Sequence, residues 1–292
     1  LRALCKMCSH HALLPRSLKI PLCYDRSGTP LYNGGYADVW KAEHEGRQVA
    51  VKALRVYLKD DFEKITSGFC KEVVVWKRLL HPNVLPLLGV TMVNTPESPL
   101  FAMASKWMEN GNINDFIRRR QDVNRFELLK DVAKGLIYMH SQDVIHGDLK
   151  GANIVIDQYF HACLADFGLA TIASDSANPT TFGSSVKGGT TRWMSPELLD
   201  PEPFNIECSR PTKESDSYAL GMVILEVLSG HPPFKQCKDT VVMLRVLEGG
   251  KPERPEGPEG EWFTDDLWEV LALCWESQRE SRPSIAAILE FL

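Results

Sequence analysis

The sequence predicts an α+β fold, in which a β-rich first part carries one helix and a longer second part is mainly helical. Short apolar segments of strand-like composition recur between residues 31 and 107. From residue 124 onward, apolar residues instead recur at steps of three and four along longer segments. The chain of 292 residues is long enough for one large domain or for a domain of two lobes.

Composition and charge narrow the class of protein. Hydrophobic residues make up 44% of the chain and charged residues 24%, which is typical of a soluble globular protein. The net charge of -5 gives no reason to expect nucleic acid as a partner. Eight cysteines are scattered without a disulfide framework, so we expect a reducing, cytoplasmic compartment. No stretch approaches the ~20 apolar residues that a membrane-spanning helix needs.

Residues 1–30 form an N-terminal extension with few structural signals. Cys5, Cys8 and His10 have the spacing of zinc ligands, but no second ligand pair follows at a usual distance. A short helix that packs its apolar side chains on the domain is the favoured interpretation. Because the chain begins with Leu1, we also expect that flanking regulatory domains can lie outside this sequence.

Residues 31–56 have the pattern of two strands joined by a turn. Residues 39–42 and 48–52 are strand-like, and residues 44–47 between them are turn formers. Gly34 and Gly35 come just before the first strand. Glycines let backbone N–H groups approach a phosphate closely, whereas the alternative is an ordinary Gly-Gly hairpin turn.

A helix is predicted over residues 60–80, since apolar residues recur there at helical spacing. Glu72 lies beside this apolar stripe. The proline at position 82 ends the helix, because proline disfavours the α conformation of the residue before it. Apolar, strand-like segments follow at residues 84–90 and 100–107, and helical spacing returns over residues 124–141.

The chemistry is concentrated between residues 146 and 168. Two short polar segments flank the apolar run 154–156, and they carry Asp148, Lys150, Asn153 and Asp166. Transfer of a phosphoryl group requires oxygen ligands for magnesium, a carboxylate that orients the attacking hydroxyl, and positive charge near the transferred group. These four side chains supply those functions. Each residue alone could be a cap or turn former, but the joint pattern is specific.

The segment His-Gly-Asp-Leu-Lys-Gly-Ala-Asn at residues 146–153 resembles the catalytic loop of eukaryotic protein kinases, and Asp-Phe-Gly at 166–168 matches their metal-binding segment. Val-Ala-Val-Lys at 49–52 fits the same family. The resemblance covers about residues 30–292 and implies a bilobal protein-kinase-like fold. It implies an N-lobe at about 31–106, a hinge at about 106–109 and a C-lobe at about 110–292.

The resemblance also implies the roles of the catalytic residues. Asp148 would accept or orient the proton of a substrate hydroxyl, and Lys150 would neutralise charge on the transferring γ-phosphoryl group of ATP. Asn153 and Asp166 would hold Mg2+. Lys52 would grip the α- and β-phosphates, and a set of further residues would bind the nucleotide: Gly34, Gly35, Val39, Ala50, Glu72, Ser105, Lys106, Met108 and Val155. Glu72 would pair with Lys52, and a small gatekeeper residue at Ser105 predicts a roomy pocket.

The same resemblance predicts the substrate class. The lysine two residues after the catalytic aspartate, together with Thr190, is typical of kinases that phosphorylate serine and threonine of protein substrates in signal transduction. The segments 193–197 and 274–275 resemble the tyrosine-kinase-like branch of that group, and residues 107–111 resemble such kinases of mushroom-forming fungi. Glu197 is expected to pair with Arg282, and Asp216 to hold the catalytic-loop backbone.

Three positions depart from the family pattern. Tyr32 and Ala37 replace glycines of the phosphate loop, and Gly147 replaces the arginine that usually binds a phosphorylated activation segment. The glycine predicts activity that does not depend on phosphorylation through that contact. The departures also support an alternative, a pseudokinase that acts as a nucleotide-binding or scaffolding module. A small-molecule phosphotransferase is a third alternative.

Overall fold

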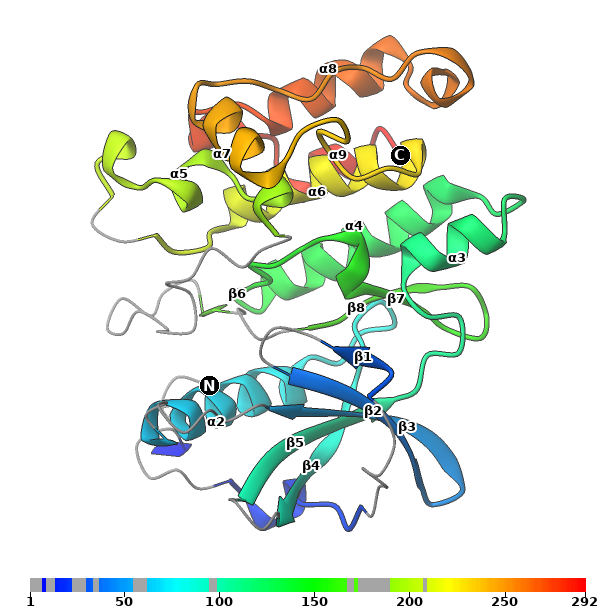
Figure 1. Ribbon diagram of the computed structural model, residues 1–292, viewed down its shortest axis with the longest axis vertical. Coiled ribbons are helices and arrows are strands. Elements are labelled where there is room, and N and C mark those ends of the chain that lie inside the picture. Colours follow the sequence, from blue (N-terminus) through cyan, green and yellow to red (C-terminus); the bar gives the residue numbers. More distant parts are fainter. Residues whose placement is uncertain are drawn as a thin grey trace. The chain divides into compact units, whose positions relative to one another are not determined.

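The structure is a computed structural model of the chain. It describes residues 7–8, 14–22, 30–33, 37–54, 62–94, 99–166, 171–172, 190–206 and 209–292. The chain divides into two compact units, Leu1–Met108 and Glu109–Leu292, within which the elements are drawn in Figure 1. The mixed α+β class that the sequence predicts is confirmed.

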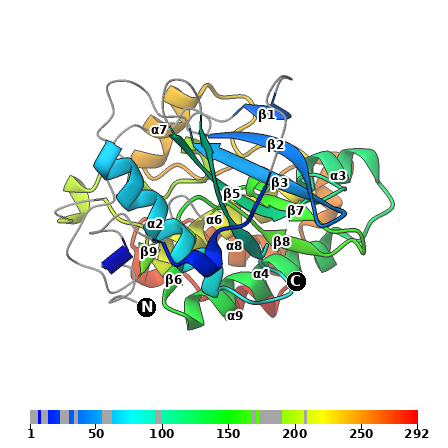
Figure 2. The ribbon, with the colours of Figure 1, turned by 90° about the horizontal axis from the view of Figure 1, so that it is seen from below.

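The smaller unit contains an antiparallel sheet in the order β1-β2-β3-β5-β4, which Figure 2 shows from a second side. Its elements are η1 (Arg16–Leu18), β1 (Tyr32–Asn33), β2 (Ala37–His44), β3 (Arg47–Leu54), α2 (Phe62–Arg78), β4 (Leu87–Asn94) and β5 (Pro99–Lys106). The predicted strands and the predicted helix are therefore present. The structure joins β2 and β3 by the turn at Glu45 and Gly46, both of which have positive φ.

Side chains alternate between the two faces of this sheet. One face buries Trp40, Val49, Val51, Ala53 and Ala104 in a common apolar cluster. The residues between them on each strand project from the opposite face. This alternation separates the core-forming positions from those predicted to bind the nucleotide.

The N-terminal extension contributes to the apolar face. Leu22 belongs to the same buried cluster, and Ile20 packs against it. Lys19 forms a parallel bridge with Val90 of β4. A Cβ at Gly89 would lie 2.6 Å from the Ile20 side chain, so the close approach of this segment requires glycine there. Residues 19–22 of the extension are therefore part of the core of the smaller unit.

The larger unit is mainly helical. Its helices are α3 (Ile113–Arg119), α4 (Arg125–Ser141), α5 (Pro196–Leu199), α6 (Lys213–Ser229), α7 (Asp239–Leu247), α8 (Asp265–Cys274) and α9 (Ile285–Leu289), with 3-10 turns η2 (Gly151–Asn153), η3 (Thr191–Trp193), η4 (Glu202–Phe204), η5 (Gly257–Trp262) and η6 (Arg279–Ser281). Short strands β6 (Val144–Ile145), β7 (Ile154–Ile156), β8 (Ala162–Leu164) and β9 (Thr171–Ile172) pair as β6–β9 and β7–β8.

Helix α6 is the buried centre of the larger unit. Every residue from Ser215 to Leu228 is buried, which explains why the sequence is apolar around the whole helix. A capping box between Thr212 and Ser215 begins the helix, and Gly230 in the left-handed conformation ends it. Among the described residues, no helix has the length and apolar character needed to cross a membrane.

Candidate active site

A buried aspartate at the start of α6 holds the predicted catalytic loop. The two oxygens of Asp216 accept hydrogen bonds from the backbone N–H groups of His146 (2.9 Å) and Gly147 (3.0 Å). The ring Nε2 of His140 lies 2.8 Å from the Asp216 carboxylate. This anchoring confirms the expected role of Asp216, and the contact with His140 is an additional one that was not predicted from the sequence.

Gly147 occupies a backbone conformation that suits glycine. Its φ is 77°, in the left-handed region that L side chains rarely adopt. The backbone N–H groups on both sides of Gly147 are also bonded. The His146 N–H donates to Asp216, and the Asp148 N–H donates to His146 Nδ1 over 3.3 Å. The His146 Nε2 in turn lies 3.1 Å from the carbonyl oxygen of Ala165. The histidine therefore ties the loop to the residue that precedes Asp166.

Asp148, Lys150 and Asn153 come together in one hydrogen-bonded group. The Lys150 ammonium lies 3.3 and 3.1 Å from the two Asp148 carboxylate oxygens. The Asn153 amide nitrogen donates to the Asp148 carbonyl over 2.7 Å and to its carboxylate over 3.0 Å. Asp148 is only 5% exposed, and its carboxylate is oriented by donors on two sides. The loop thus fixes the rotamer of this carboxylate.

Lys150 also bridges the catalytic loop to a distant segment. Its ammonium donates to the hydroxyl of Thr190 over 2.7 Å, and Thr190 is buried. A lysine and a threonine separated by 40 residues therefore meet beside Asp148. Lys150 and Thr190, which together predict the substrate class, therefore lie in one group with Asp148.

Asn153 lies just before β7, and Asp166 lies two residues after β8, its antiparallel partner. Ile154 pairs with Leu164, and the Ala165 N–H donates to the Asn153 carbonyl over 2.9 Å. Asp166 comes next and has a φ of 61°, in the left-handed region. Because the Asn153 amide nitrogen donates to Asp148, its oxygen Oδ1 is the atom left for a ligand. An amide oxygen and a carboxylate are the donors that Mg2+ prefers.

In the smaller unit, Lys52 and Glu72 form the expected ion pair. The Lys52 ammonium lies 3.3 Å from a Glu72 carboxylate oxygen, and the side chains are 19% and 11% exposed. Lys52 lies on β3 and Glu72 on α2, so the pair fixes the strand to the helix. Figure 1 shows α2 alongside the sheet of this unit.

The strand register places the predicted adenine-site residues on the face that carries Lys52. Val39 pairs with Lys52 across β2 and β3, and Ala50 pairs with Ser105 across β3 and β5. Directly paired residues share a face, and so do alternate residues on one strand. Ser105 is buried, which supports its assignment to a small gatekeeper position.

The remaining residues predicted to bind the nucleotide differ in how exposed they are. Lys106 is exposed at the end of β5, Met108 is buried, and the Trp107 N–H between them donates to the Gln48 carbonyl over 3.2 Å. Val155 lies on β7, pairs with Cys163 and is partly buried. The phosphate-loop residues Gly34 and Gly35 lie outside the described residues.

The resemblance to protein kinases further implies that Trp76, Leu87, His146 and Phe167 stack as one column of side chains. Residues 167–170 and 173–189, which include Phe167 and parts of the activation segment, lie outside the described residues. Within their own units, Trp76, Leu87 and His146 are each buried. The Trp76 indole N–H donates to the Leu85 carbonyl over 2.5 Å. Stacking of this column between the lobes stays a prediction.

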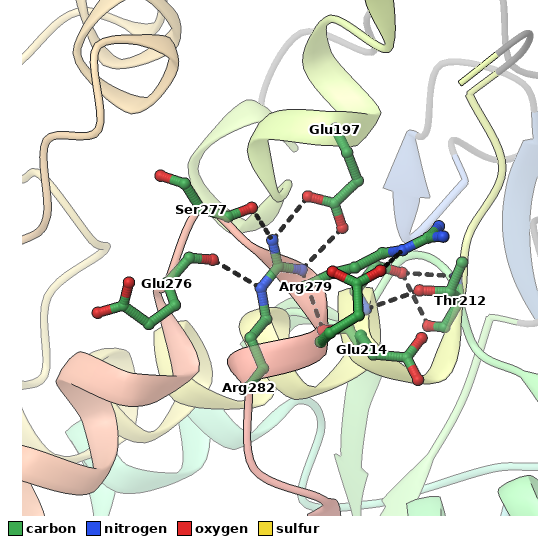
Figure 3. Close-up of polar contacts among 9 residues, drawn as sticks. Glu197, Thr212, Glu214, Glu276, Ser277, Arg279 and Arg282 are labelled. Carbon is green, nitrogen blue, oxygen red and sulfur yellow. Dashed lines mark hydrogen bonds and ion pairs between the residues drawn. The ribbon is translucent and has the colours of Figure 1, made fainter. Parts of the chain in front are cut away.

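The expected Glu197–Arg282 pair is confirmed and is drawn in Figure 3. The guanidinium donates to both carboxylate oxygens over 2.7 Å, and the two side chains are 2% and 0% exposed. Arg282 also donates to the backbone carbonyls of Glu276 (2.8 Å) and Glu214 (3.2 Å). The ring of Tyr218 lies 5.2 Å from the guanidinium, and burial raises the pKa of this tyrosine.

One functional candidate was missed from the sequence. Glu226, in the apolar part of α6, accepts hydrogen bonds from the Gly151 N–H (2.9 Å), the Trp193 indole N–H (2.9 Å) and the Asn114 amide (2.6 Å). Burial raises the pKa of the Glu226 carboxyl, and the three hydrogen bonds with the Lys150 charge oppose that shift. A charged residue inside an otherwise apolar helix was the available signal.

Comparison with known proteins agrees with this arrangement. A family model described as protein tyrosine and serine/threonine kinase matches residues 27–292. The chain belongs to this family. The kinase domain is 28% identical to serine/threonine-protein kinase STY46 of Arabidopsis thaliana over 279 residues, which cover 94% of this chain and 44% of the relative.

Two further plant relatives bear on the type of kinase. Serine/threonine-protein kinase CTR1 of Arabidopsis thaliana is 28% identical over 284 residues, covering 94% of this chain and 32% of the relative. Serine/threonine/tyrosine-protein kinase HT1 of the same plant is 26% identical over 275 residues, covering 90% and 65%. STY46 and CTR1 are thus named as serine/threonine kinases, whereas HT1 is named as a kinase of serine, threonine and tyrosine. The kinase domain spans less than half the length of STY46 and CTR1.

Proposed function

We propose that this kinase domain transfers the γ-phosphoryl group of Mg-ATP to serine and threonine hydroxyls of protein substrates. The observation that carries the proposal is the bridge in which Lys150 contacts both the Asp148 carboxylate and the Thr190 hydroxyl. This bridge places a cation beside the carboxylate that would receive the substrate hydroxyl. Phosphoryl transfer needs that combination of orientation and positive charge.

Asp148 is suited to orient a hydroxyl group. Its carboxylate accepts from Lys150 and Asn153, and these donors restrict its rotation without removing its capacity to accept a further hydrogen bond. A substrate hydroxyl donating to Asp148 would present its oxygen lone pair to the phosphoryl group. The proton of the hydroxyl would pass to the Asp148 carboxylate as the new P–O bond forms and the bond between the γ-phosphorus and the β,γ-bridging oxygen of ATP breaks, with ADP as the leaving group.

The residues present fit a magnesium-bound triphosphate. Asn153 and Asp166 would hold Mg2+ through oxygen atoms, and Lys52, oriented by Glu72, would bind the phosphates. When bound, the metal neutralises charge on the phosphate oxygens, and ATP supplies the phosphoryl group. Val39, Ala50 and Ser105 would contact the base from the face that carries Lys52, with the hinge residues Lys106 and Met108 beside them.

A pseudokinase is the second candidate. The non-glycine residues at Tyr32 and Ala37 favour it, because they weaken the phosphate loop. Against it stand the Lys52–Glu72 pair and the group formed by Asp148, Lys150 and Asn153. We propose that these groups serve catalysis, in a cytoplasmic signalling protein whose flanking segments supply regulation.

A phosphorylation screen tests the proposal. The native protein and Asp148→Asn are incubated with radiolabelled ATP, Mg2+ and an array of serine, threonine and tyrosine peptides. We expect the native protein to label serine and threonine peptides and the variant to lose at least about 100-fold in rate. Thermal shift with Mg-ATP is measured in parallel. Binding of Mg-ATP without labelling of any peptide would favour the pseudokinase.

A further inference from the structure

The position of Glu226 is unfavourable for a carboxylate. It lies in the apolar part of α6 and is only 4% exposed. Burying a carboxylate away from water is unfavourable unless hydrogen bonds compensate for the lost solvation. A leucine would pack in such a helix without that requirement. The carboxylate therefore requires an explanation beyond the packing of α6.

The hydrogen bonds of Glu226 join three separate segments. One carboxylate oxygen, Oε2, accepts from both the Gly151 backbone N–H and the Trp193 indole N–H, each over 2.9 Å. The other oxygen, Oε1, accepts from the Asn114 side-chain amide over 2.6 Å. The three donors come from η2, η3 and α3.

Two of these donors lie next to the catalytic group. Gly151 directly follows Lys150 and begins the turn that ends at Asn153, and Trp193 ends the turn that follows Thr190. The Lys150–Thr190 hydrogen bond already joins these two segments. Glu226 joins the same two segments a second time. One contact permits the segments to pivot about it, whereas two contacts fix both their separation and their orientation.

Asn114 holds the carboxylate from its other side. A Cβ at position 151 would lie 2.5 Å from the Asn114 amide atoms, so Asn114 packs directly against the glycine of the loop. The Asn114 amide bonds Oε1 and so restricts rotation of the carboxylate about its terminal bond. The close approach of Asn114 therefore requires glycine at position 151, and the Asn114 bond to Oε1 leaves Oε2 directed toward the Gly151 N–H.

We propose that Glu226 is a positioning residue, which sets the separation between the catalytic loop and the segment Thr190–Trp193 through its shared oxygen Oε2. The proposal rests on the kinase activity proposed above. All three groups that contact the carboxylate are N–H donors. These contacts therefore require acceptor oxygens, which a neutral side chain of the same shape can also supply.

This distinction selects the variants. Glu226→Gln keeps an oxygen for Gly151 and Trp193, and its amide group can donate to Asn114 if that side chain turns its oxygen inward. Glu226→Leu removes the acceptor, and Trp193→Phe removes one donor. Val223→Ala, at a fully buried position of α6, is the control for general loss of stability in the same helix.

Activity of the variants is measured on a serine or threonine peptide, with separate titrations of peptide and Mg-ATP. We expect kcat to fall about 100-fold in Glu226→Leu and about 10-fold in Trp193→Phe, because small misplacements of reacting groups cost factors of this size. Glu226→Gln should stay within about threefold of the native kcat, and the KM for ATP should not change. Val223→Ala should keep the native kcat at a temperature where it is folded.

Hydrogen exchange of the amides in residues 148–153 gives a second readout that needs no activity. We expect faster exchange in Glu226→Leu and Trp193→Phe and native exchange in Glu226→Gln. The proposal is overturned if Glu226→Gln behaves like Glu226→Leu, or if Trp193→Phe leaves both kcat and exchange unchanged. If the native protein labels no peptide, the proposed function fails, and the exchange pattern alone still decides the role of Glu226.

Discussion

Removing Arg282 should destabilise the protein more than most single substitutions, because it leaves a buried carboxylate without its partner. Arg282 forms two 2.7 Å hydrogen bonds to Glu197, and neither side chain is more than 2% exposed. Breaking a buried pair from one side costs about 3–5 kcal/mol. Arg282→Met should therefore lower the melting temperature by roughly 6–20 °C, at ~2–4 °C per kcal/mol.

A double variant distinguishes the contribution of the Glu197–Arg282 ion pair from that of the other hydrogen bonds of Arg282. Glu197→Leu together with Arg282→Met removes both charges, so no unpaired charge stays buried. The backbone carbonyls of Glu276 and Glu214 still lose a donor, which limits the recovery to part of the loss. We expect the double variant to be more stable than either single variant.

Equilibrium unfolding in urea of the native protein, the two single variants and the double variant completes the cycle. The predicted result is a coupling free energy of at least about 2 kcal/mol between Glu197 and Arg282. Additive losses in the double variant would refute the reasoning. They would mean that the two side chains stabilise the fold independently, despite the geometry shown in Figure 3.

Four further predictions follow from single positions. Gly147→Ala and Gly147→Arg should each lower the free energy of unfolding by about 1–2 kcal/mol, because a side chain at φ 77° strains the backbone. If urea unfolding shows both variants to be as stable as the native protein, position 147 carries no such strain. Ser195→Ala should raise stability by up to about 1 kcal/mol, since the buried Ser195 hydroxyl has no hydrogen-bond partner within the part of the chain that is described. Because burial raises the pKa of Glu226, the native state binds that proton more tightly than the unfolded state, and this contribution to stability falls as pH rises through the raised pKa. The melting temperature of Glu226→Gln minus that of the native protein should therefore increase from about pH 4 to about pH 8, and a constant difference would argue against the shift. Ser105→Phe should weaken binding of bulky ATP-competitive compounds by about tenfold or more while ATP itself still binds, which competition titrations measure.

The catalytic segment could be predicted from the sequence because its residues lie close together along the chain. Asp148, Lys150 and Asn153 fall within six positions, and the turn at Gly151–Asn153 folds them into one group. The Lys52–Glu72 pair was also predictable, since a strand lysine and a helix glutamate were both recognisable by the resemblance.

Other features depend on tertiary structure that local patterns do not encode. Glu226 meets Gly151 and Asn114 across 75 and 112 residues, so only the folded chain shows that its charge is satisfied. Leu22 is part of the core of the smaller unit, although the surrounding sequence carries no strand or helix period. Long-range packing of an irregular segment leaves no periodic signal.

A structure of the protein crystallised with Mg2+ and a non-hydrolysable ATP analogue tests the central claim most directly. We predict one triphosphate whose α- and β-phosphates contact Lys52, with the metal bound by Asn153 and Asp166 and with Asp148 facing the γ-phosphate. Nucleotide bound elsewhere, or a metal that contacts neither Asn153 nor Asp166, would contradict the account.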